Sequence, residues 1–463
     1  MGEYNRDLSQ NPCHMCMPMG GILALKGIEG AMPLLHGSQG CSTYMRRHIA
    51  EHFNEPVDVA SSALNEKGTV YGGKANLKKA MDNVRRVYQP KLIGILTTCL
   101  AETIGEDIRQ ISSEYQAETE CECRIVTAAT PGYGGTHTEG YWRTLRELLV
   151  QLTAPVEKHE RINLIVPAAL SPVDLRQIKQ TLALFGAEYT LLPDISETMD
   201  RPYEDSYGKM ADGGTPLAEI AQMAGALATL ELGGPVDVKL SPGQLLQDSY
   251  GVPLYKLPIP IGLANSDQFI EAISTVLNKP VPAAIRRERG LLMDAMIDAH
   301  KHSFQVRPVL FGDPEMVFAL AGFCAENGMF PGVVATGGGS AGWRKAVAEL
   351  LADSMNPLDV IEETDMLIVR ARSEANQVNL AVGPSVGRYL EEQADIPLVR
   401  IGFPIQDRLG AQRILSVGYQ GTALLLDKMV NCLLERKHKT YRSDLFQAYY
   451  QEREVARHEL SGS

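Results

Sequence analysis

No stretch of this sequence approaches the roughly 18 to 20 apolar residues that a membrane-spanning helix needs, and its first residues have neither the basic nor the apolar segment of a secretory signal. It also lacks a dense run of lysine or arginine, because 44 basic side chains face 56 acidic ones for a net charge of -12. Nucleic acid binding depends on such basic groups to neutralise phosphates. We therefore expect a soluble, cytoplasmic protein that binds neither membrane nor nucleic acid.

Cysteine is scarce as well, with 8 residues in a chain of 463. So few thiols do not make a disulfide scaffold in a chain of this length, and in a reducing compartment they are free, metal-bound or buried. The length exceeds what one hydrophobic core usually supports, which predicts two or three domains. Each cysteine must therefore be judged by its position.

What the sequence does have is a recurring alternation of short apolar runs with amphipathic stretches. Runs of strand length lie at 92–96, 162–166, 189–192, 306–311, 333–335 and 366–369, and helical spacing is found at 74–88, 101–115, 172–185, 283–302 and from Pro314 onward. Apolar strands separated by amphipathic helices indicate parallel sheets covered on both faces. We therefore predict an α/β fold built from several doubly wound units.

Boundaries between these units are expected where the alternation is interrupted. The segment 153–158 lies between a helix and a new strand, and the long helical stretch 283–302 leads into a further unit. We therefore divide the chain into domains at 1–158, 159–300 and 301–463. The charged tail beyond Leu434 is expected to be a solvated helix or a strap on a partner subunit.

Three cysteines stand at the heads of loops among small neighbours. Cys41 ends the segment His-Gly-Ser-Gln-Gly-Cys, Cys16 lies between a proline and a glycine pair, and Cys99 directly follows an apolar run. Thiolates are the ligands that iron–sulfur clusters and zinc select. Because structural zinc sites usually take their cysteines as close pairs, separated thiols at the carboxyl edge of a sheet favour a cluster, with further ligands supplied by another subunit.

The same positions also allow a plainer interpretation, since free cysteine is among the most buried residue types. Cys324 and Cys432, at helical spacing, are interpreted as apolar filler, and Cys121 and Cys123 as a structural pair on one side of a strand. Cys13 is a candidate spare ligand. For the three loop cysteines, composition and spacing alone do not decide between cluster ligands and buried apolar residues.

Other candidate sites are weaker. The glycine-rich segment 337–342 follows a predicted strand but lacks both the dinucleotide and the phosphate-loop spacing, so it is predicted to be a flexible turn. His36, beside the Cys41 loop, is predicted to be a hydrogen-bonded structural residue in preference to a proton carrier. His137 is interpreted in the same way.

The cysteine contexts resemble the β subunit of the nitrogenase molybdenum–iron protein and its relatives. The matching segments are 11–18, 36–41, 97–107 and 402–408, and the resemblance extends over nearly the whole chain. It implies three Rossmann-like, doubly wound parallel-sheet domains in each subunit and an α2β2 heterotetramer with a homologous α subunit. The first domain would bind the cluster, and the third would end in a helical tail.

The resemblance also implies a role for particular residues. Cys16, Cys41 and Cys99 would supply the β half of an 8Fe-7S P-cluster at the α/β interface, the alternative being a 4Fe-4S cluster. The subunit would relay electrons from an ATP-dependent iron protein, a reductase homodimer, to a catalytic iron–sulfur metallocofactor in the α subunit. Tyr71 corresponds to an aromatic residue on the surface that docks the reductase, and Tyr44 to one close to the cluster.

Departures from the family pattern distinguish its branches. Gly132 replaces a serine that can bind the oxidised cluster in dinitrogenase β chains, and Asn54 replaces a usual arginine. The segment 170–232 is more similar to the β-like chain of the cofactor-maturation scaffold, which typically lacks a cysteine at the position of Cys99.

These features lead us to expect a nitrogenase-like oxidoreductase subunit. The leading candidate is methylthio-alkane reductase, a nitrogenase-like enzyme that cleaves carbon–sulfur bonds of small thioethers. A true dinitrogenase β subunit and a non-catalytic maturation scaffold are the alternatives within the family. A zinc-binding or regulatory protein is the alternative outside it.

Overall fold

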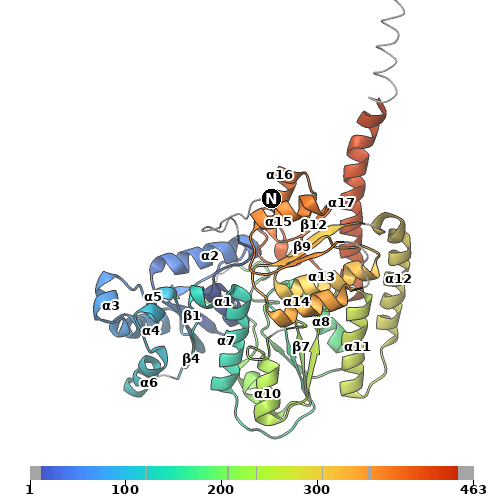
Figure 1. Cartoon of the computed structure of the whole chain (residues 1–463). Coiled ribbons are helices and arrows are strands. Elements are labelled where there is room, and N and C mark those ends of the chain that lie inside the picture. The colour runs from blue at the N-terminus through green and yellow to red at the C-terminus, as the bar shows by residue number, and fades with distance from the viewer. Residues whose placement is uncertain are drawn as a thin grey trace, which may run out of the picture.

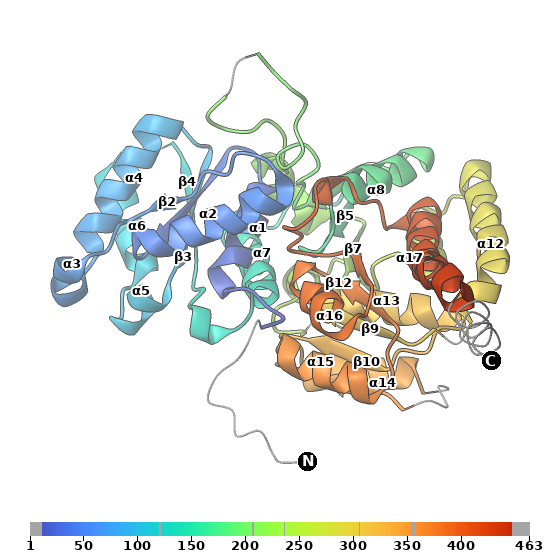
Figure 2. The same cartoon turned by 90° about the horizontal axis from the view of Figure 1, so that it is seen from above.

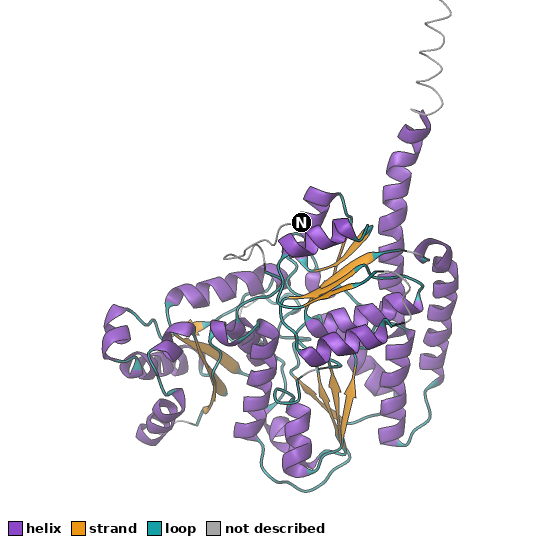
Figure 3. Cartoon of the chain, viewed as in Figure 1, coloured by secondary structure: helices purple, strands orange, loops and turns teal. Residues whose placement is uncertain are grey.

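The computed structural model describes residues 12–119, 122–205, 208–235, 237–304, 306–352 and 357–446. Strands and helices alternate along the chain, and the strands form three separate sheets (Figures 1 and 3). All the strand pairs in them are parallel. The predicted fold class is therefore confirmed. Each sheet takes its strands from one of the predicted domain ranges, whose boundaries stay a prediction.

The first sheet lies at one side of the molecule and has the strand order β2-β1-β3-β4 (Figure 2). Its strands are β1 (Ala31–His36), β2 (Ala60–Ser61), β3 (Leu92–Thr97) and β4 (Arg124–Ala128), and its helical elements are α1 (Met17–Lys26), α2 (Gln39–Phe53), α3 (Glu66–Tyr71), α4 (Lys74–Tyr88), α5 (Cys99–Thr103), α6 (Ile108–Glu118), η1 (Gly132–Gly134) and α7 (His137–Leu152). β1 and β3 are buried along their whole length, as expected for central parallel strands. The chain leaves these two neighbours in opposite directions, which opens a crevice beyond their carboxyl ends.

The second sheet has the order β6-β5-β7-β8. Its elements are β5 (Ile162–Ile165), α8 (Pro172–Leu184), β6 (Tyr189–Leu192), α9 (Leu217–Gln222), η2 (Met223–Gly225), β7 (Ala228–Leu232), α10 (Pro242–Tyr250), β8 (Leu254–Leu257), α11 (Leu263–Leu277) and α12 (Ala283–Ser303). α8 begins at a capping box, in which Ser171 and Asp174 bond each other's backbone N–H groups. Pro172 follows the cap at the first helical position, where its missing N–H costs nothing.

The third sheet has the order β11-β10-β9-β12-β13. Its elements are β9 (Pro308–Gly312), α13 (Pro314–Glu326), β10 (Val333–Thr336), α14 (Ala341–Leu350), β11 (Asp359–Ile361), α15 (Met366–Ala375), β12 (Leu380–Gly383), η3 (Ser385–Gly387), α16 (Arg388–Ala394), β13 (Leu398–Arg400), η4 (Ala411–Arg413) and α17 (Gly418–Phe446). One hydrophobic cluster includes Leu96, Leu164 and Leu310, one from each sheet. The three units therefore share a core.

The predicted strand at 366–369 is wrong, because these residues open helix α15. The side chain of Asp365 accepts hydrogen bonds from the backbone N–H groups of Leu367 and Ile368. Such an N-cap starts a helix. A short apolar run does not by itself distinguish a buried strand from a buried helix turn.

The single helix predicted at 101–115 is divided into α5 and α6. Gly105 lies between them with φ of +76°, a left-handed conformation that glycine adopts without strain. The side chain of Asp107 then caps α6 by accepting the N–H of Gln110. The division allows a helix to begin directly at Cys99.

The last helix runs beside α12 and then projects from the body of the molecule (Figures 1 and 2). It includes the first part of the charged tail predicted to be helical, up to Phe446. The rest of that tail, with Glu452 and Arg453, lies outside the described residues. Within the described ranges, no helix has the length and apolarity needed to cross a membrane.

Candidate metal centre

Cys41 and Cys99 lie at the crevice where the strand order of the first sheet reverses. β1 and β3 end side by side, with His36 opposite Thr97. The loop after β1 places Cys41 in the first turn of α2, and Thr98 is the N-cap of α5, which begins at Cys99. Helix N-termini carry partial positive charge that favours thiolates. The sequence thus places both thiols at the edge where parallel sheets bind their ligands.

The loop after β1 is held tightly against β3. Thr98 donates to the carbonyl of His36 from its N–H, at 3.2 Å, and from its hydroxyl, at 3.1 Å. A Cβ at Gly37 would clash with the side chain of Thr98, so only glycine allows this close approach. The spacing of the two cysteine-bearing loops is therefore set by backbone contacts.

Cys16 reaches the same place from the start of α1, for which it is the N-cap residue. It forms an isolated antiparallel bridge with Thr136, just before α7. Gly132 lies between the thiols: its N–H donates to Cys99 Sγ at 3.1 Å, and a Cβ there would be 2.6 Å from Cys16 Sγ and 3.1 Å from Cys99 Sγ. The structure therefore brings Cys16 and Cys99 together around one glycine.

The electrostatics of Cys16 place the third thiol nearby. Burial, and then the neighbouring Cys99 and Cys41, raise the pKa of Cys16 to about 11. The hydroxyl of Ser38 donates to Cys41 Sγ at 3.7 Å. Ionising Cys16 at this place is therefore costly unless positive charge is brought in, which a metal supplies.

The chemistry of this set fits an iron–sulfur cluster. It offers three soft thiol ligands and backbone N–H donors that can bond to sulfur. Cys99 is exposed, whereas Cys16 and Cys41 are partly buried, so one side of the set is open. Over the part of the chain that the structure describes, no three or more His, Cys, Asp or Glu side chains form a group that could hold a metal ion by themselves.

Cys13 points away from the other thiols. It is buried, and its Sγ lies 3.6 Å from Met366 Sδ in the third unit. Burial, and then the nearby Asp365, raise the pKa of Cys13 to about 12. In this structure it is a core residue, which argues against a spare ligand.

Two of the remaining cysteines lie in helices, as the filler interpretation requires. Cys324 is fully buried in α13, and Cys432 is partly buried in α17. Cys123 precedes β4, which begins at Arg124, so the predicted alternating strand pair does not extend to it. Cys121 lies outside the described residues.

The two tyrosines differ in position. Tyr44 lies one turn beyond Cys41 in α2, and its pKa is raised by burial and by the nearby Cys16. Its side chain is 45% exposed, so it lies next to the thiols at the surface. Tyr71 ends α3 and is 82% exposed, which leaves its ring available to a partner.

A carboxylate that sequence reasoning did not single out braces the site. Glu106 accepts the N–H of Gly73 at 2.6 Å and contacts His36 Nε2 at 3.3 Å. His36 is fully buried, and its Nδ1 lies 2.9 Å from Ser62 Oγ, which in turn accepts the N–H of Gly37. His36 is thus a hydrogen-bonded structural residue. Glu106 lies within the matching segment 97–107, but nothing in the sequence singles it out within that segment.

The fold consists of three units, each built on a doubly wound parallel sheet. The three cysteines lie near the crevice of the first sheet. Together these features define an α/β protein with thiols at one sheet edge. The family model described as nitrogenase component 1 type oxidoreductase matches residues 16–434. The chain belongs to this family and is an oxidoreductase subunit of the β-chain type. The family inferred from the cysteine motifs is confirmed.

The similarity to curated relatives extends over nearly the full length of both chains. The nitrogenase molybdenum–iron protein beta chain of Methanococcus maripaludis is 33% identical over 443 residues, which cover 93% of this chain and 95% of the relative. The beta chain from Clostridium pasteurianum is 33% identical over 430 residues, with 92% and 93% covered.

A solved structure described as nitrogenase Cp1 at pH 6.5 has a TM-score of 0.90 at 32% identity, covering 94% of this chain and 95% of the other. Another chain, described as nitrogenase Cp1 at pH 5, has a TM-score of 0.69 at 14% identity. At that identity it shows only that the fold is shared.

Proposed function

We propose that this chain is the β-type subunit that supplies Cys16, Cys41 and Cys99 to a P-cluster-type iron–sulfur cluster shared with a homologous α subunit in an α2β2 complex. The observation that carries the proposal is the meeting of Cys16 and Cys99 around Gly132, with Cys41 close enough to act on Cys16, on an open sheet edge. A half set of ligands on an exposed edge fits a cluster completed by a second chain. When bound, such a cluster supplies one-electron storage and transfer.

The chain's own residues would then orient the thiols and shield them. Ser38 and the amide of Gly132 donate to sulfur, and such hydrogen bonds tune the potential of a cluster. The exposed ring of Tyr71 would form part of the surface that docks an ATP-dependent reductase. Electrons would pass from that reductase toward a catalytic metallocofactor in the α subunit.

For the reaction of the complex, we favour reductive cleavage of carbon–sulfur bonds in small thioethers over reduction of dinitrogen. Gly132 supports this choice, because a side chain there would meet two of the thiols, yet this chain has none that could replace a thiolate as ligand. Cys99 in turn favours a cluster-bearing reductase subunit over the maturation scaffold, which typically lacks a cysteine at that position.

The first test replaces Cys99 by alanine in the purified complex. If the chain holds an eight-iron cluster, the variant should lose the iron and sulfide of that cluster, its spectroscopic signal and nearly all reductase turnover. A scaffold with a four-iron cluster would be almost indifferent to the change. Cys324→Ala is the matched control, since that thiol is buried in α13 of the third unit. The iron content of this variant should stay at the wild-type level.

Two measurements on the wild-type complex separate the alternatives. With its reductase and ATP, it should convert dimethyl sulfide to a thiol and an alkane. Reduction of dinitrogen alone would make the chain a dinitrogenase β subunit. Metal analysis that finds zinc without iron or acid-labile sulfide would instead support the zinc-binding alternative.

A further inference from the structure

The segment that bears Cys16 is held along its edge by the start of α7. The N–H of Met15 donates to His137 Nδ1 at 3.1 Å, and the N–H of His137 donates to the carbonyl of Met15 at 3.0 Å. The adjacent pair, Cys16 and Thr136, forms the bridge described above. The imidazole of His137 is thus the one side chain that bonds the backbone next to this thiol in the described contacts.

The other edge of the same imidazole faces the third unit. His137 Nε2 lies 2.9 Å from Asp313 Oδ1, and each side chain is 2% exposed. Because Nδ1 accepts the N–H of Met15, the neutral ring carries its proton on Nε2, toward the carboxylate. Asp313 is the N-cap residue of α13, directly after β9. His137 therefore connects a strand end of the third sheet to the cysteine segment of the first unit.

This connection is costly, which argues for a role beyond packing. His137 Nε2 and Asp313 Oδ2 are both buried without a hydrogen-bond partner, and leaving such groups unsatisfied opposes folding. An apolar pair of the same size often fills such a space at lower cost. A functional role is one of the explanations for unsatisfied buried polar groups.

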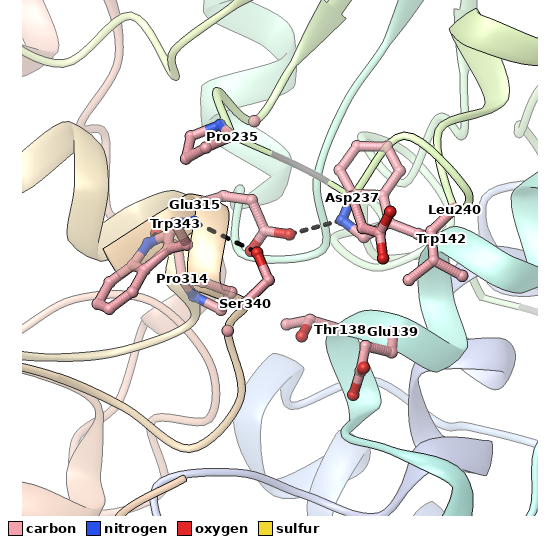
Figure 4. A pocket seen from close by; sticks show the side chains of 12 residues that line it. Thr138, Glu139, Trp142, Pro235, Asp237, Leu240, Pro314, Glu315, Ser340 and Trp343 are labelled. Carbon is pink, nitrogen blue, oxygen red and sulfur yellow. Dashed lines mark hydrogen bonds between the residues drawn. The ribbon is translucent and has the colours of Figure 1, made fainter. Parts of the chain in front are cut away.

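A second carboxylate fixes the same two helices next to this contact. Glu315, in the first turn of α13, accepts the Nε1–H of Trp142 of α7 at 2.5 Å. Figure 4 shows this bond at a cavity of about 60 Å³ between α7, α13, the start of α14 and the loop before α10. The beginning of α7, with His137, is therefore held in place relative to the third unit.

We propose that His137 is a positioning residue for Cys16: it holds the ligand-bearing backbone at Met15, and the close contact of its Nε2 with Asp313 keeps the imidazole in place. This inference rests on the proposed function, because it assigns His137 to the shared cluster. Asp313 lies 176 residues further along the chain than His137. The inference therefore makes the third unit part of the ligand geometry of the first. Outer groups that orient a ligand commonly change metal affinity by about 10- to 100-fold when removed.

Two near-isosteric variants of His137 distinguish the effect of the Nδ1 contact with Met15 from that of the Nε2 contact with Asp313. His137→Asn keeps an acceptor close to the position of Nδ1 and gives up the contact with Asp313. His137→Gln keeps a donor close to the position of Nε2 and gives up the acceptor for Met15. We expect the purified His137→Gln complex to release iron to a chelator about 10-fold faster or more and to show an altered cluster spectrum. His137→Asn should stay close to wild type, and Asp313→Ala should lie between the two.

His52 provides the matched control. It is a buried histidine that accepts a backbone N–H, from Ile405 at 2.8 Å, but it does not bond a neighbour of a thiol ligand. His52→Gln should lower the melting temperature without changing the rate of iron release or the spectrum. Equal iron release from His137→Gln and wild type, or an equal increase in His52→Gln, would overturn the proposal.

Failure of the proposed function is a separate outcome. A wild-type complex without iron and sulfide would contradict the cluster itself. An iron-loaded wild type with an unaffected His137→Gln variant would contradict only the role of His137. Because iron release and spectrum are read without turnover, neither outcome depends on the substrate of the complex.

Discussion

Two histidines serve this chain as neutral, buried hydrogen-bonding residues. His36 and His52 are both less than 5% exposed, and each has a ring nitrogen within bonding distance of the backbone or of a serine. Burial in a low-dielectric site disfavours the imidazolium form. Their role at ordinary pH is therefore to fix backbone next to the sheet edges, and protonation would disturb it.

His52 allows the cost of that protonation to be measured. Burial lowers its pKa from 6.5 to about 3, so between these values the unfolded chain binds a proton that the folded chain does not. The contribution of His52 is fully present above pH 6.5 and is lost as the pH falls below it, by at most about 1.4 kcal/mol per pH unit. The free energy of unfolding of His52→Asn, which keeps an acceptor for Ile405, should fall less steeply than that of wild type between pH 6.5 and 5. Parallel curves would contradict this assignment.

Helix starts are the elements that build the joints between units. Asp174 caps α8, and its carboxylate also accepts the N–H of Ser416 at 2.7 Å and that of Val417 at 3.2 Å, just before α17. Asp365 likewise caps α15, and its backbone bridges to Pro12. Asp313, at the start of α13, makes no side-chain capping bond and contacts His137 instead. The caps at Asp174 and Asp365 satisfy their own helices and tie them to a second element.

Replacing Asp174 by asparagine should therefore cost more than the loss of an ordinary cap. In wild type, three backbone N–H groups donate to the buried carboxylate of Asp174. The amide of asparagine would direct an N–H donor at one of these donors. We therefore expect a loss of about 2–3 kcal/mol in the free energy of unfolding. Asp107→Asn, at the exposed cap of α6, should cost below about 1 kcal/mol. Denaturant unfolding of both variants checks the difference, and equal losses would show that the link to α17 contributes nothing.

Helices and strands with a clear repeat of apolar residues could be predicted from the sequence. Elements whose position depends on helix caps or on contacts distant in the sequence could not. The apolar face of 74–88 and the run at 92–96 correspond to α4 and β3, because local pattern and burial agree there. The run 366–369 was misassigned because Asp365 starts a helix that the apolar pattern does not reveal. Likewise, the motifs identified the three thiols, whereas the contact of His137 with Asp313 spans units and leaves no local signal.

At the scale of the whole molecule, three separate parallel sheets share one hydrophobic core (Figures 1 and 2). The crevice of the first sheet holds the thiols. The carboxyl end of the third sheet supplies Asp313 and Glu315, which contact α7 from the other side. The thiol site therefore depends on the packing of the units against one another as well as on its own loops.

Glu315 gives that packing a pH dependence of opposite sign to that of His52. Burial, and then the nearby Asp313, raise its pKa from 4.5 to about 7, so from pH 4.5 to 7 the folded chain holds a proton that the unfolded chain has lost. Its stabilising contribution is present below pH 4.5 and is lost as the pH rises to about 7, with a total of about 3 kcal/mol or less.

The wild-type pH profile combines both effects, so a variant is needed to separate them. Glu315→Gln keeps an oxygen to accept the Nε1–H of Trp142 and removes the titration. We expect its free energy of unfolding to match wild type near pH 5 and to exceed it by about 1–3 kcal/mol at pH 8, because wild type must then bury a second carboxylate beside Asp313. Unfolding the metal-free chain at both pH values checks this without interference from the cluster. A variant that is equally destabilised at pH 5 and pH 8 would show that Glu315 contributes only its bond to Trp142.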